Sequence, residues 1–207
     1  MLALLVACAL ALTALIAVLA YLKSSQAPEG TSLPPMGADQ TMGVRSETPN
    51  DRLLEPTEVS MIASSTKDPA PRGVDCRPSS AYDGDVETSW CEGVAGDGSG
   101  ESLTVTFNGG PYKVTRILIV AGYDKEKDDE FGDRWTLNNR PKKVRVALGG
   151  AFYECAVNPE NRGFQPLNFP GSSPVEGVTL FFDDVIKGTA KTDSDLCISE
   201  IQVYVEK

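Results

Sequence analysis

SLTVTF, residues Ser102–Phe107, alternates apolar with polar side chains. This two-residue period is typical of a β-strand with one buried and one exposed face. Thr115–Ala121 (TRILIVA) is a continuous apolar run, as found in strands buried on both sides, and Lys142–Leu148 (KKVRVAL) alternates again. The middle of the chain therefore predicts a β-sheet core.

Further short segments have the same β-branched and aromatic composition: Val59–Ala63, Phe152–Val157, Gly177–Ile186 and Cys197–Val205. Gly- and Pro-rich turns separate the strands, and no amphipathic helical period is visible after residue 60. About eight short strands of this kind predict an all-β jelly-roll sandwich over residues 58–207. Its long loops, residues 67–100 and 124–141, are where we expect function.

The first residues have a different character. Leu2–Leu22 is apolar and uncharged, and at about 1.5 Å per residue it is long enough for one helix across a bilayer core of about 30 Å. We expect an uncleaved signal-anchor, a transmembrane helix over residues 1–22. The alternative is a signal peptide cleaved after residue 27, but Pro28 directly after that site disfavours cleavage.

Residues 23–57 join this segment to the predicted sandwich. They are rich in Pro and small polar residues and have no sustained period, so they cannot bury enough apolar area to offset their conformational entropy. We expect a flexible linker that lifts the domain from the membrane. The predicted location of the domain is outside the cytoplasm, or fully secreted if residues 1–27 are removed.

Cys76, Cys91, Cys155 and Cys197 follow the linker. An even set of cysteines in an exported domain predicts two disulfides, with three possible connectivities. We favour Cys76–Cys91 with Cys155–Cys197, and the alternative is four buried free thiols. No CxxC pair is present, so a structural zinc site is not expected.

The charge and the missing histidine exclude several functions. The net charge of −10 repels phosphate backbones, so we expect no nucleic-acid partner. The chain contains no histidine, which removes Ser-His-Asp and Cys-His catalysis and histidine-bound metal. An acidic chain remains compatible with a cation site.

An acidic turn, Asp83-Gly84-Asp85, is followed by Thr88. Carboxylate, hydroxyl and carbonyl oxygens that converge at such a turn are the ligands that calcium prefers. A distant carboxylate, Glu200, is a candidate to complete the shell, so we expect a structural Ca²⁺ on Asp83, Asp85, Thr88 and Glu200. The alternative is a metal-free Asx turn.

The same turn carries a family resemblance. Asp83-Gly84-Asp85-x-x-Thr88-x-Trp90 resembles the signature of discoidin, or coagulation-factor C-type, domains, which have the galactose-binding-like jelly-roll fold. Five further motifs occur in an order similar to that of the NADase-type glycan-binding branch: Thr88–Gly93, Gly96–Glu101, Ile119–Tyr123, Asn139–Val144 and Asp195–Ile201. The resemblance covers residues 58–207. It implies a non-catalytic sugar-binding module, and in related members a calcium ion braces the loops at the positions of Asp83, Asp85, Thr88 and Glu200.

A second constellation lies in the loop from Tyr123 to Arg140. Sugar recognition needs an aromatic face together with polar groups that bind hydroxyls, and this loop supplies both. The candidate ligand-binding residues are Tyr123, Arg134, Trp135, Asn139 and Arg140. The alternative is a solvated charged loop in which Trp135 covers the core.

We therefore predict a glycan-binding module that is anchored in the membrane through residues 2–22 and binds cell-surface glycoconjugates. The rival prediction is an adhesion module that binds an envelope protein and no sugar. An enzyme is not expected. Two-carboxylate glycoside hydrolysis needs a deep cleft between pairs such as Asp183 with Glu200 or Asp129 with Asp133, and a domain this small offers little room for one.

Overall fold

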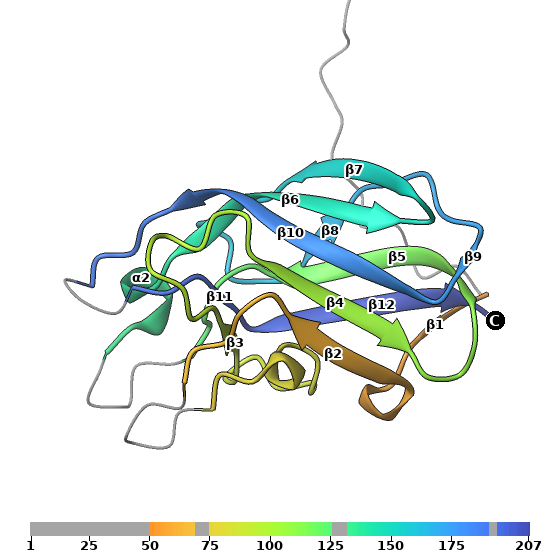
Figure 1. The fold of residues 1–207 in the computed structure, drawn as a ribbon, viewed down its shortest axis with the longest axis horizontal. Helices are drawn as coiled ribbons and strands as arrows, with labels where there is room; N and C mark the ends of the chain where they lie inside the picture. Colours follow the sequence, from red (N-terminus) through yellow and green to blue (C-terminus); the bar gives the residue numbers. More distant parts are fainter. Residues whose placement is uncertain (1–49, 69–74, 126–131, 191–193) are drawn as a thin grey trace, which may run out of the picture. The chain divides into compact units, whose positions relative to one another are not determined.

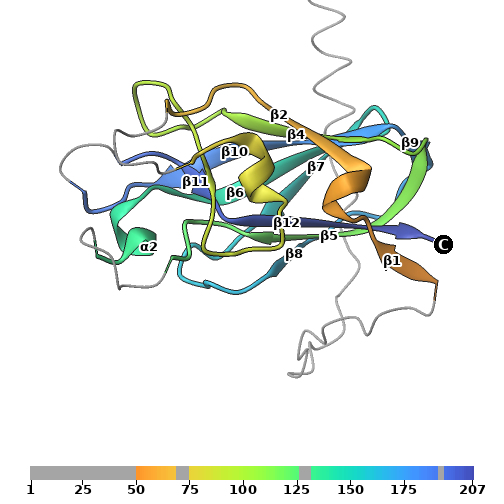
Figure 2. The ribbon, with the colours of Figure 1, turned by 90° about the horizontal axis from the view of Figure 1, so that it is seen from below.

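The computed structural model describes residues 50–68, 75–125, 132–190 and 194–207, all within a compact unit that spans Arg45–Lys207. Two β-sheets pack face to face (Figures 1 and 2). The predicted all-β sandwich is confirmed. Among the described residues no helix has the length and hydropathy needed to cross a bilayer, and the predicted anchor, residues 1–22, lies outside the described residues.

The first sheet is fully antiparallel. Its order is β2 (Val59–Ala63), β4 (Ser102–Phe107), β10 (Gly177–Ile186), β6 (Arg140–Leu148) and β7 (Ala151–Ala156). The alternating pattern of β4 buries Leu103, Val105 and Phe107 and turns its threonines outward. In this sheet β2 and β7 are the edge strands.

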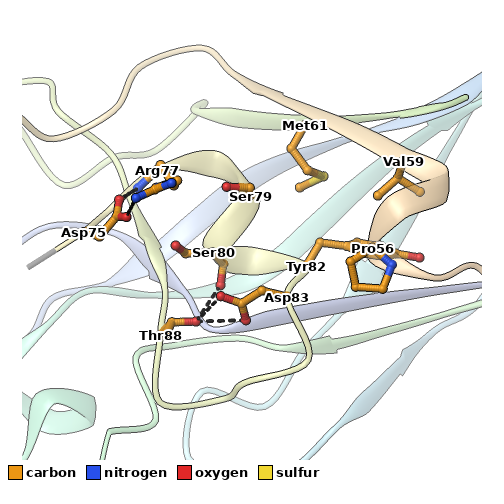
Figure 3. Close-up of a pocket in the computed structure, with 10 residues that line it drawn as sticks. All are labelled: Pro56, Val59, Met61, Asp75, Arg77, Ser79, Ser80, Tyr82, Asp83 and Thr88. Atoms are coloured by element: carbon orange, nitrogen blue, oxygen red, sulfur yellow. Dashed lines mark hydrogen bonds and ion pairs between the residues drawn. The ribbon is translucent and has the colours of Figure 1, made fainter.

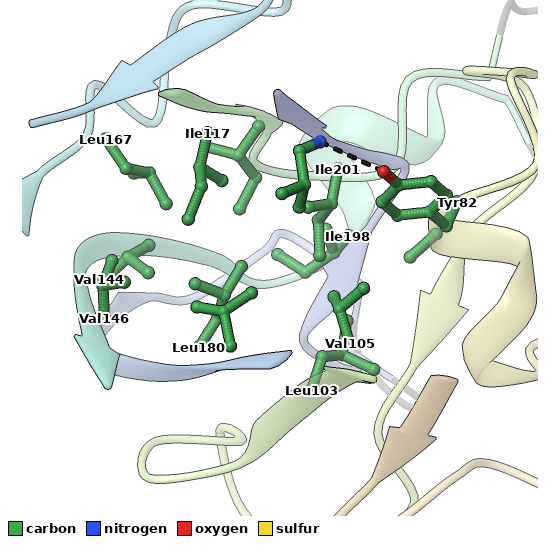
Figure 4. Close-up of a cluster of buried hydrophobic side chains, with 14 of the residues drawn as sticks. Tyr82, Leu103, Val105, Ile117, Val144, Val146, Leu167, Leu180, Ile198 and Ile201 are labelled. Carbon is green, nitrogen blue, oxygen red and sulfur yellow. Dashed lines mark hydrogen bonds between the residues drawn. The ribbon is translucent and has the colours of Figure 1, made fainter. Parts of the chain in front are cut away.

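The second sheet contains the continuous apolar run. Its order is β1 (Asp51–Leu53), β12 (Glu200–Glu206), β5 (Tyr112–Val120) and β8 (Gln165–Leu167), and β9 (Pro174–Val175) also pairs with β5. Figure 4 shows how the inner faces meet: Ile117 and Ile201 of this sheet lie near Val146 and Leu180 of the first. All four side chains are fully buried.

The loops at one end of the sandwich form small elements of their own. There β3 (Trp90–Cys91) pairs with β11 (Cys197–Ile198), and the 3₁₀-helix η2 (Pro78–Ala81) and the short helix α2 (Arg134–Leu137) lie in the connections. Trp90 is buried, and its ring packs 5.6 Å from that of Phe182. The hydroxyl of Tyr82 donates to the carbonyl of Leu54 (3.1 Å) and accepts from the amide of Val203 (3.2 Å), which fixes η2 to the second sheet.

The predicted linker boundary is too late. The prediction places residues 51–57 in the linker, yet β1 pairs with β12, from Asp51 opposite Glu206 to Leu53 opposite Tyr204. A further 3₁₀-helix, η1 (Pro56–Glu58), leads into β2. The domain therefore begins several residues earlier than its apolar period indicates. The remainder of the predicted linker, residues 23–49, lies outside the described residues.

The favoured disulfide pairing is wrong. Cys91 is joined to Cys197, and their Cα atoms lie 4.2 Å apart because the antiparallel register of β3 and β11 sets the two residues opposite each other. Cys76 and Cys155 are free and buried. Burial raises the pKa of Cys76 to about 11, which makes this thiol unreactive at neutral pH. The Cys155 thiol donates to the carbonyl of Asn168 (3.3 Å).

Candidate functional site

Oxygen atoms crowd around the hydroxyl of Thr88. Its Oγ1 lies 3.0 and 2.9 Å from the two carboxylate oxygens of Asp83 and 3.1 Å from the carbonyl of Ser80 (Figure 3). It also lies 2.9 Å from the carbonyl of Asp85. A hydroxyl has one hydrogen, so it can donate to only one of these four acceptors. The other oxygens therefore face one another without a donor from Thr88.

Glu200 adds a carboxylate to the same turn from the start of β12. It is 3% exposed, and its Oε2 accepts from the amide of Gly84 at 3.3 Å. Burial, together with the nearby negative charges of Asp83 and Asp85, raises the pKa of Glu200 to about 7. The carboxylates of Asp83 and Glu200 thus lie near each other at this turn.

The Asp85 side chain does not have the position predicted for a calcium ligand. Its side-chain Oδ1 accepts from the amide of Glu87 at 2.9 Å, so the carboxylate closes a local turn, and it is the carbonyl that faces Thr88. Among the described residues there is no group of three or more His, Cys, Asp or Glu side chains suited to a metal. A cation here would rely on Thr88 and main-chain oxygens as well as on Asp83 and Glu200.

This donor set fits calcium. All the atoms are hard oxygens, drawn from carboxylates, a hydroxyl and backbone carbonyls, which is the mixture that Ca²⁺ selects. A cation would neutralise the carboxylates of Asp83 and Glu200 and remove the oxygen–oxygen contacts around Thr88. Three of the four predicted side chains, Asp83, Thr88 and Glu200, therefore lie close together. Asp85 contributes its carbonyl, and the carbonyl of Ser80 is a further oxygen.

A groove of about 410 Å³ opens beside this turn, between β2 and η2 (Figure 3). Val59, Met61 and Pro56 give it an apolar wall, and Asp83 and Thr88 lie at its rim. Arg77 and Asp75, which form an exposed ion pair, bring charged groups to another part of the rim. A smaller hollow of about 170 Å³ reaches Glu200 from the other side of Asp83.

The Tyr123–Arg140 loop has a different arrangement from the predicted sugar platform. Trp135 is 2% exposed, and its Nε1 donates to the carbonyl of Pro159 at 3.1 Å. Its ring packs so closely on Gly122 that a Cβ there would lie 2.6 Å from Cζ3. Trp135 therefore offers no open face for stacking and covers the core instead. Tyr123 is also buried, with the Arg134 guanidinium 5.6 Å from its ring centre.

Asn139 and Arg140 are buried as well, and their polar atoms bind the surrounding loops. The amide of Asn139 donates to the carbonyls of Ser194 (2.6 Å) and Asp97 (3.3 Å), and its oxygen accepts from the amide of Gly188 (2.8 Å). Arg140 donates to the carbonyls of Trp135, Asn138 and Pro159. These contacts hold the loops at this end of the sandwich together. Of the five residues predicted to bind sugar, only Arg134 is half-exposed, and the other four are buried.

Sequence reasoning missed Arg162. Its guanidinium lies 2.6 Å from Asp133 and 3.6 Å from Asp124, and 5.6 Å from the Trp135 ring centre. The hydrogen bond to Asp133 raises the pKa of Arg162 above its ordinary value. Arg162 lies far along the chain from the Tyr123–Arg140 loop, so only the fold brings these groups together.

Comparison with known proteins identifies the family. The model of the NAD glycohydrolase translocation F5/8 type C domain matches residues 56–204. The chain belongs to this family. For an F5/8 type C domain, the sandwich and the acidic turn at one end are the arrangement that the sequence motifs implied, and the resemblance is confirmed.

Solved structures agree on the fold. The F5/8 type C domain described here is similar to the family 32 carbohydrate-binding module of Clostridium perfringens NanJ in complex with galactose (TM-score 0.50, 19% identity, 74% of this chain and 98% of that one). A second C. perfringens module, in complex with GalNAc-β-1,3-galactose, gives a TM-score of 0.51 at 15% identity over 73% and 99% of the two chains. A third, from a C. perfringens family 31 glycoside hydrolase, gives 0.52 at 18% identity over 75% and 95%.

At these identities the likeness concerns the fold alone. A comparison with curated protein sequences gives no match.

Proposed function

We propose that this F5/8 type C domain is a non-catalytic glycan-binding module. The observation that carries the proposal is its membership of a family whose fold it shares with carbohydrate-binding modules, two of which are described with a galactose-containing ligand. The carboxylates of the acidic turn brace a loop, and Asp183 is engaged by Arg145. We assign none of these carboxylates a catalytic role.

We further propose that the glycan occupies the groove between β2 and η2. The groove is concave, and it combines an apolar wall with charged and hydroxyl groups, as sugar sites require. Val59 and Met61 would contact the C–H face of a sugar ring. Arg77 and Asp75 would bind its hydroxyls with directional hydrogen bonds.

Calcium would hold one rim of this groove. Asp83 and Thr88 line the groove and also belong to the oxygen cluster. When bound, the ion would supply positive charge that fixes the turn. Glycan affinity should therefore depend on calcium through the shape of the rim.

We place the domain outside the cytoplasm, held by residues 2–22. The Cys91–Cys197 disulfide supports an oxidising compartment, and the anchor rests on the apolar sequence of those residues. Glycoconjugates of a cell surface are then the accessible partners.

The test is a glycan-array screen of the full chain in detergent, with calcium and with EDTA. We expect binding that Arg77→Ala weakens and that Arg77→Lys, which keeps the charge but loses the guanidinium fork, restores only in part. Arg134→Ala tests the loop at the same time. Binding that Arg134→Ala removes while Arg77→Ala leaves it intact would move the site to that loop. A chain that binds no glycan in either condition would favour a protein partner.

A further inference from the structure

Three side chains meet on the outer face of the first sheet, away from the groove. Arg145 of β6 lies opposite Phe181 of β10, and Phe152 of β7 lies opposite Ala147, the next outward residue after Arg145. Their neighbours Val144, Val146, Leu180 and Phe182 are buried in the core. Because side chains alternate along a strand, Arg145, Phe152 and Phe181 must point to the opposite face.

The guanidinium of Arg145 lies beside both rings. Cζ of Arg145 lies 4.8 Å from the centre of the Phe181 ring and 5.6 Å from that of Phe152, and the ring centres are 6.3 Å apart with an angle of 48° between the planes. Asp183 accepts from Arg145 Nε at 3.1 Å, which sets the orientation of the guanidinium. We call Arg145, Phe152, Phe181 and Asp183 the sheet-face cluster.

The sheet-face cluster exposes an aromatic ring and polar atoms that could contact a ligand. Phe152 is 61% exposed, and the centre of its ring lies 5.6 Å from Cζ of Arg145. The side chains of Arg145 and Asp183 are 37% and 29% exposed. Among the described residues the hydrogen bonds use only Nε of the guanidinium and one oxygen of the carboxylate. An open aromatic ring beside free donors and acceptors matches the alternating apolar and hydroxyl faces of a sugar.

Charge selects a neutral ligand for this surface. Arg145 is paired with Asp183, and the adjacent Lys143 is paired with Glu154 at 3.4 Å, so the surface carries no net charge. The chain as a whole carries −10, which repels an anionic polymer or an anionic membrane. A neutral, hydroxyl-rich chain meets neither repulsion nor an unpaired charge.

A second copy of the protein fits this surface less well. Ile62, 65% exposed, is the other strongly exposed apolar residue on this face. It lies at the opposite edge of the same row, with Thr104, Thr179 and Ala147 between it and Phe152. Stable interfaces bury about 800 Å² per partner around an apolar centre, and here the centre of the row consists of small side chains.

We propose that the sheet-face cluster is a second glycan-binding site, for a chain of neutral sugars. This second site rests on the proposed function in one respect, namely that the ligand is a glycan. It lies at the β7 edge and on the outer face of the sheet, whereas the groove lies at the β2 edge. Two sites on one domain bind a long polysaccharide more tightly than a short oligosaccharide, because the second contact is intramolecular.

The test is affinity electrophoresis of the full chain in detergent through gels that contain galactomannan or xyloglucan, with alginate as the acidic comparison. Phe152→Ala should weaken retention on the neutral polymers about tenfold. The variant lacks the aromatic ring and the apolar area that the ring would bury against the sugar. Arg145→Lys, which keeps the charge but loses the guanidinium fork, should give a smaller loss. Phe164→Ala, at an exposed phenylalanine on the turn before β8, is the matched control and should behave as wild type.

The outcomes separate this proposal from the groove. Loss in Phe152→Ala with normal retention in Arg77→Ala supports the sheet-face cluster even if the groove proves wrong. Normal retention in both Phe152→Ala and Phe152→Leu overturns it while leaving the groove standing. A molar mass by light scattering that halves in Phe152→Ala overturns it in favour of a dimer interface. A wild-type chain that binds neither neutral polymer overturns the sheet-face cluster, and the glycan array then decides the groove by itself.

Discussion

Cys91 and Cys197 lie opposite each other on two-residue strands and are joined by a disulfide across a sequence separation of 106 residues. The bond connects the long β2–β4 connection to the segment that leads into β12. Glu92, the next residue, accepts through its carboxylate from the amides of Val94 (2.6 Å) and Leu196 (3.3 Å). One short pair of strands thus holds the loop end of the sandwich together.

We predict that Cys91→Ser lowers the free energy of unfolding by about 3–5 kcal/mol, because closing so long a loop removes much of the entropy of the unfolded chain. Urea unfolding of the oxidised protein measures the change. Cys155→Ser, which affects a free thiol on β7, is the control and should cost less. Peptide mapping that finds Cys76 linked to Cys91 would contradict the assignment.

The stability of the calcium-free protein should fall as pH rises through neutrality. The pKa of Glu200 is raised from 4.5 to about 7 in the folded state, so the folded protein holds this proton more tightly than the unfolded chain does. The resulting stabilisation is complete below about pH 4.5 and is lost as pH rises to about 7, at most about 3 kcal/mol. Urea unfolding in EDTA measures it. Glu200→Gln keeps the shape without the titration, so a decline of equal size in that variant would assign the effect to other groups.

Calcium should reverse this loss, because it stabilises the ionised form of Glu200. At a concentration about 100 times Kd, calcium adds about 2.7 kcal/mol to the free energy of unfolding, so the melting temperature of the wild type should rise by about 5–10 °C. Asp83→Asn and Thr88→Val should abolish the rise.

Asp85→Asn provides the matched control for these variants. The Asp85 side chain accepts from the amide of Glu87, which an asparagine oxygen can also do, so this variant should keep the response to calcium. If Asp85→Asn removed the response as fully as Asp83→Asn does, the carboxylate of Asp85 would have to be a ligand.

The sequence predicts those strands whose burial follows a clear period. Val59–Ala63, Ser102–Phe107 and Gly177–Ile186 are strands with the predicted bounds. The strand Asp51–Leu53 was missed because its three residues are all half-buried and include two charges. Its place depends on pairing with Glu200–Glu206, at the far end of the chain. The helix Arg134–Leu137 is too short to show a helical period.

The site was predictable where its chemistry is local. Asp83 and Thr88 are five residues apart, and their spacing alone indicates an oxygen cluster. Glu200 lies far along the chain from this turn, so the sequence offered it only as a candidate that the family resemblance supported, and the register of Glu200–Glu206 brings it there. The disulfide depends on the pairing of two-residue strands, and the groove depends on η2 lying against β2. Neither relationship has a periodic signal in the sequence.

Substitutions of Trp135 distinguish a side chain that stacks on a sugar from one that packs in the core. Its ring lies against Gly122, and its Nε1 donates to the carbonyl of Pro159. Trp135→Ala should therefore lower the free energy of unfolding by about 3–5 kcal/mol. Trp135→Phe, which keeps a ring but loses the donor, should cost about 1–3 kcal/mol.

Glycan binding decides between the two roles of Trp135. A core residue affects binding only through stability, so Trp135→Ala should keep the affinity of the wild type at temperatures where the variant is folded. Isothermal titration with a glycan found by the array, beside urea unfolding of the same samples, measures both quantities. If Trp135→Ala lost affinity while its free energy of unfolding stayed unchanged, the ring would have to reach the ligand. The loop from Tyr123 to Arg140 would then replace the groove as the sugar site.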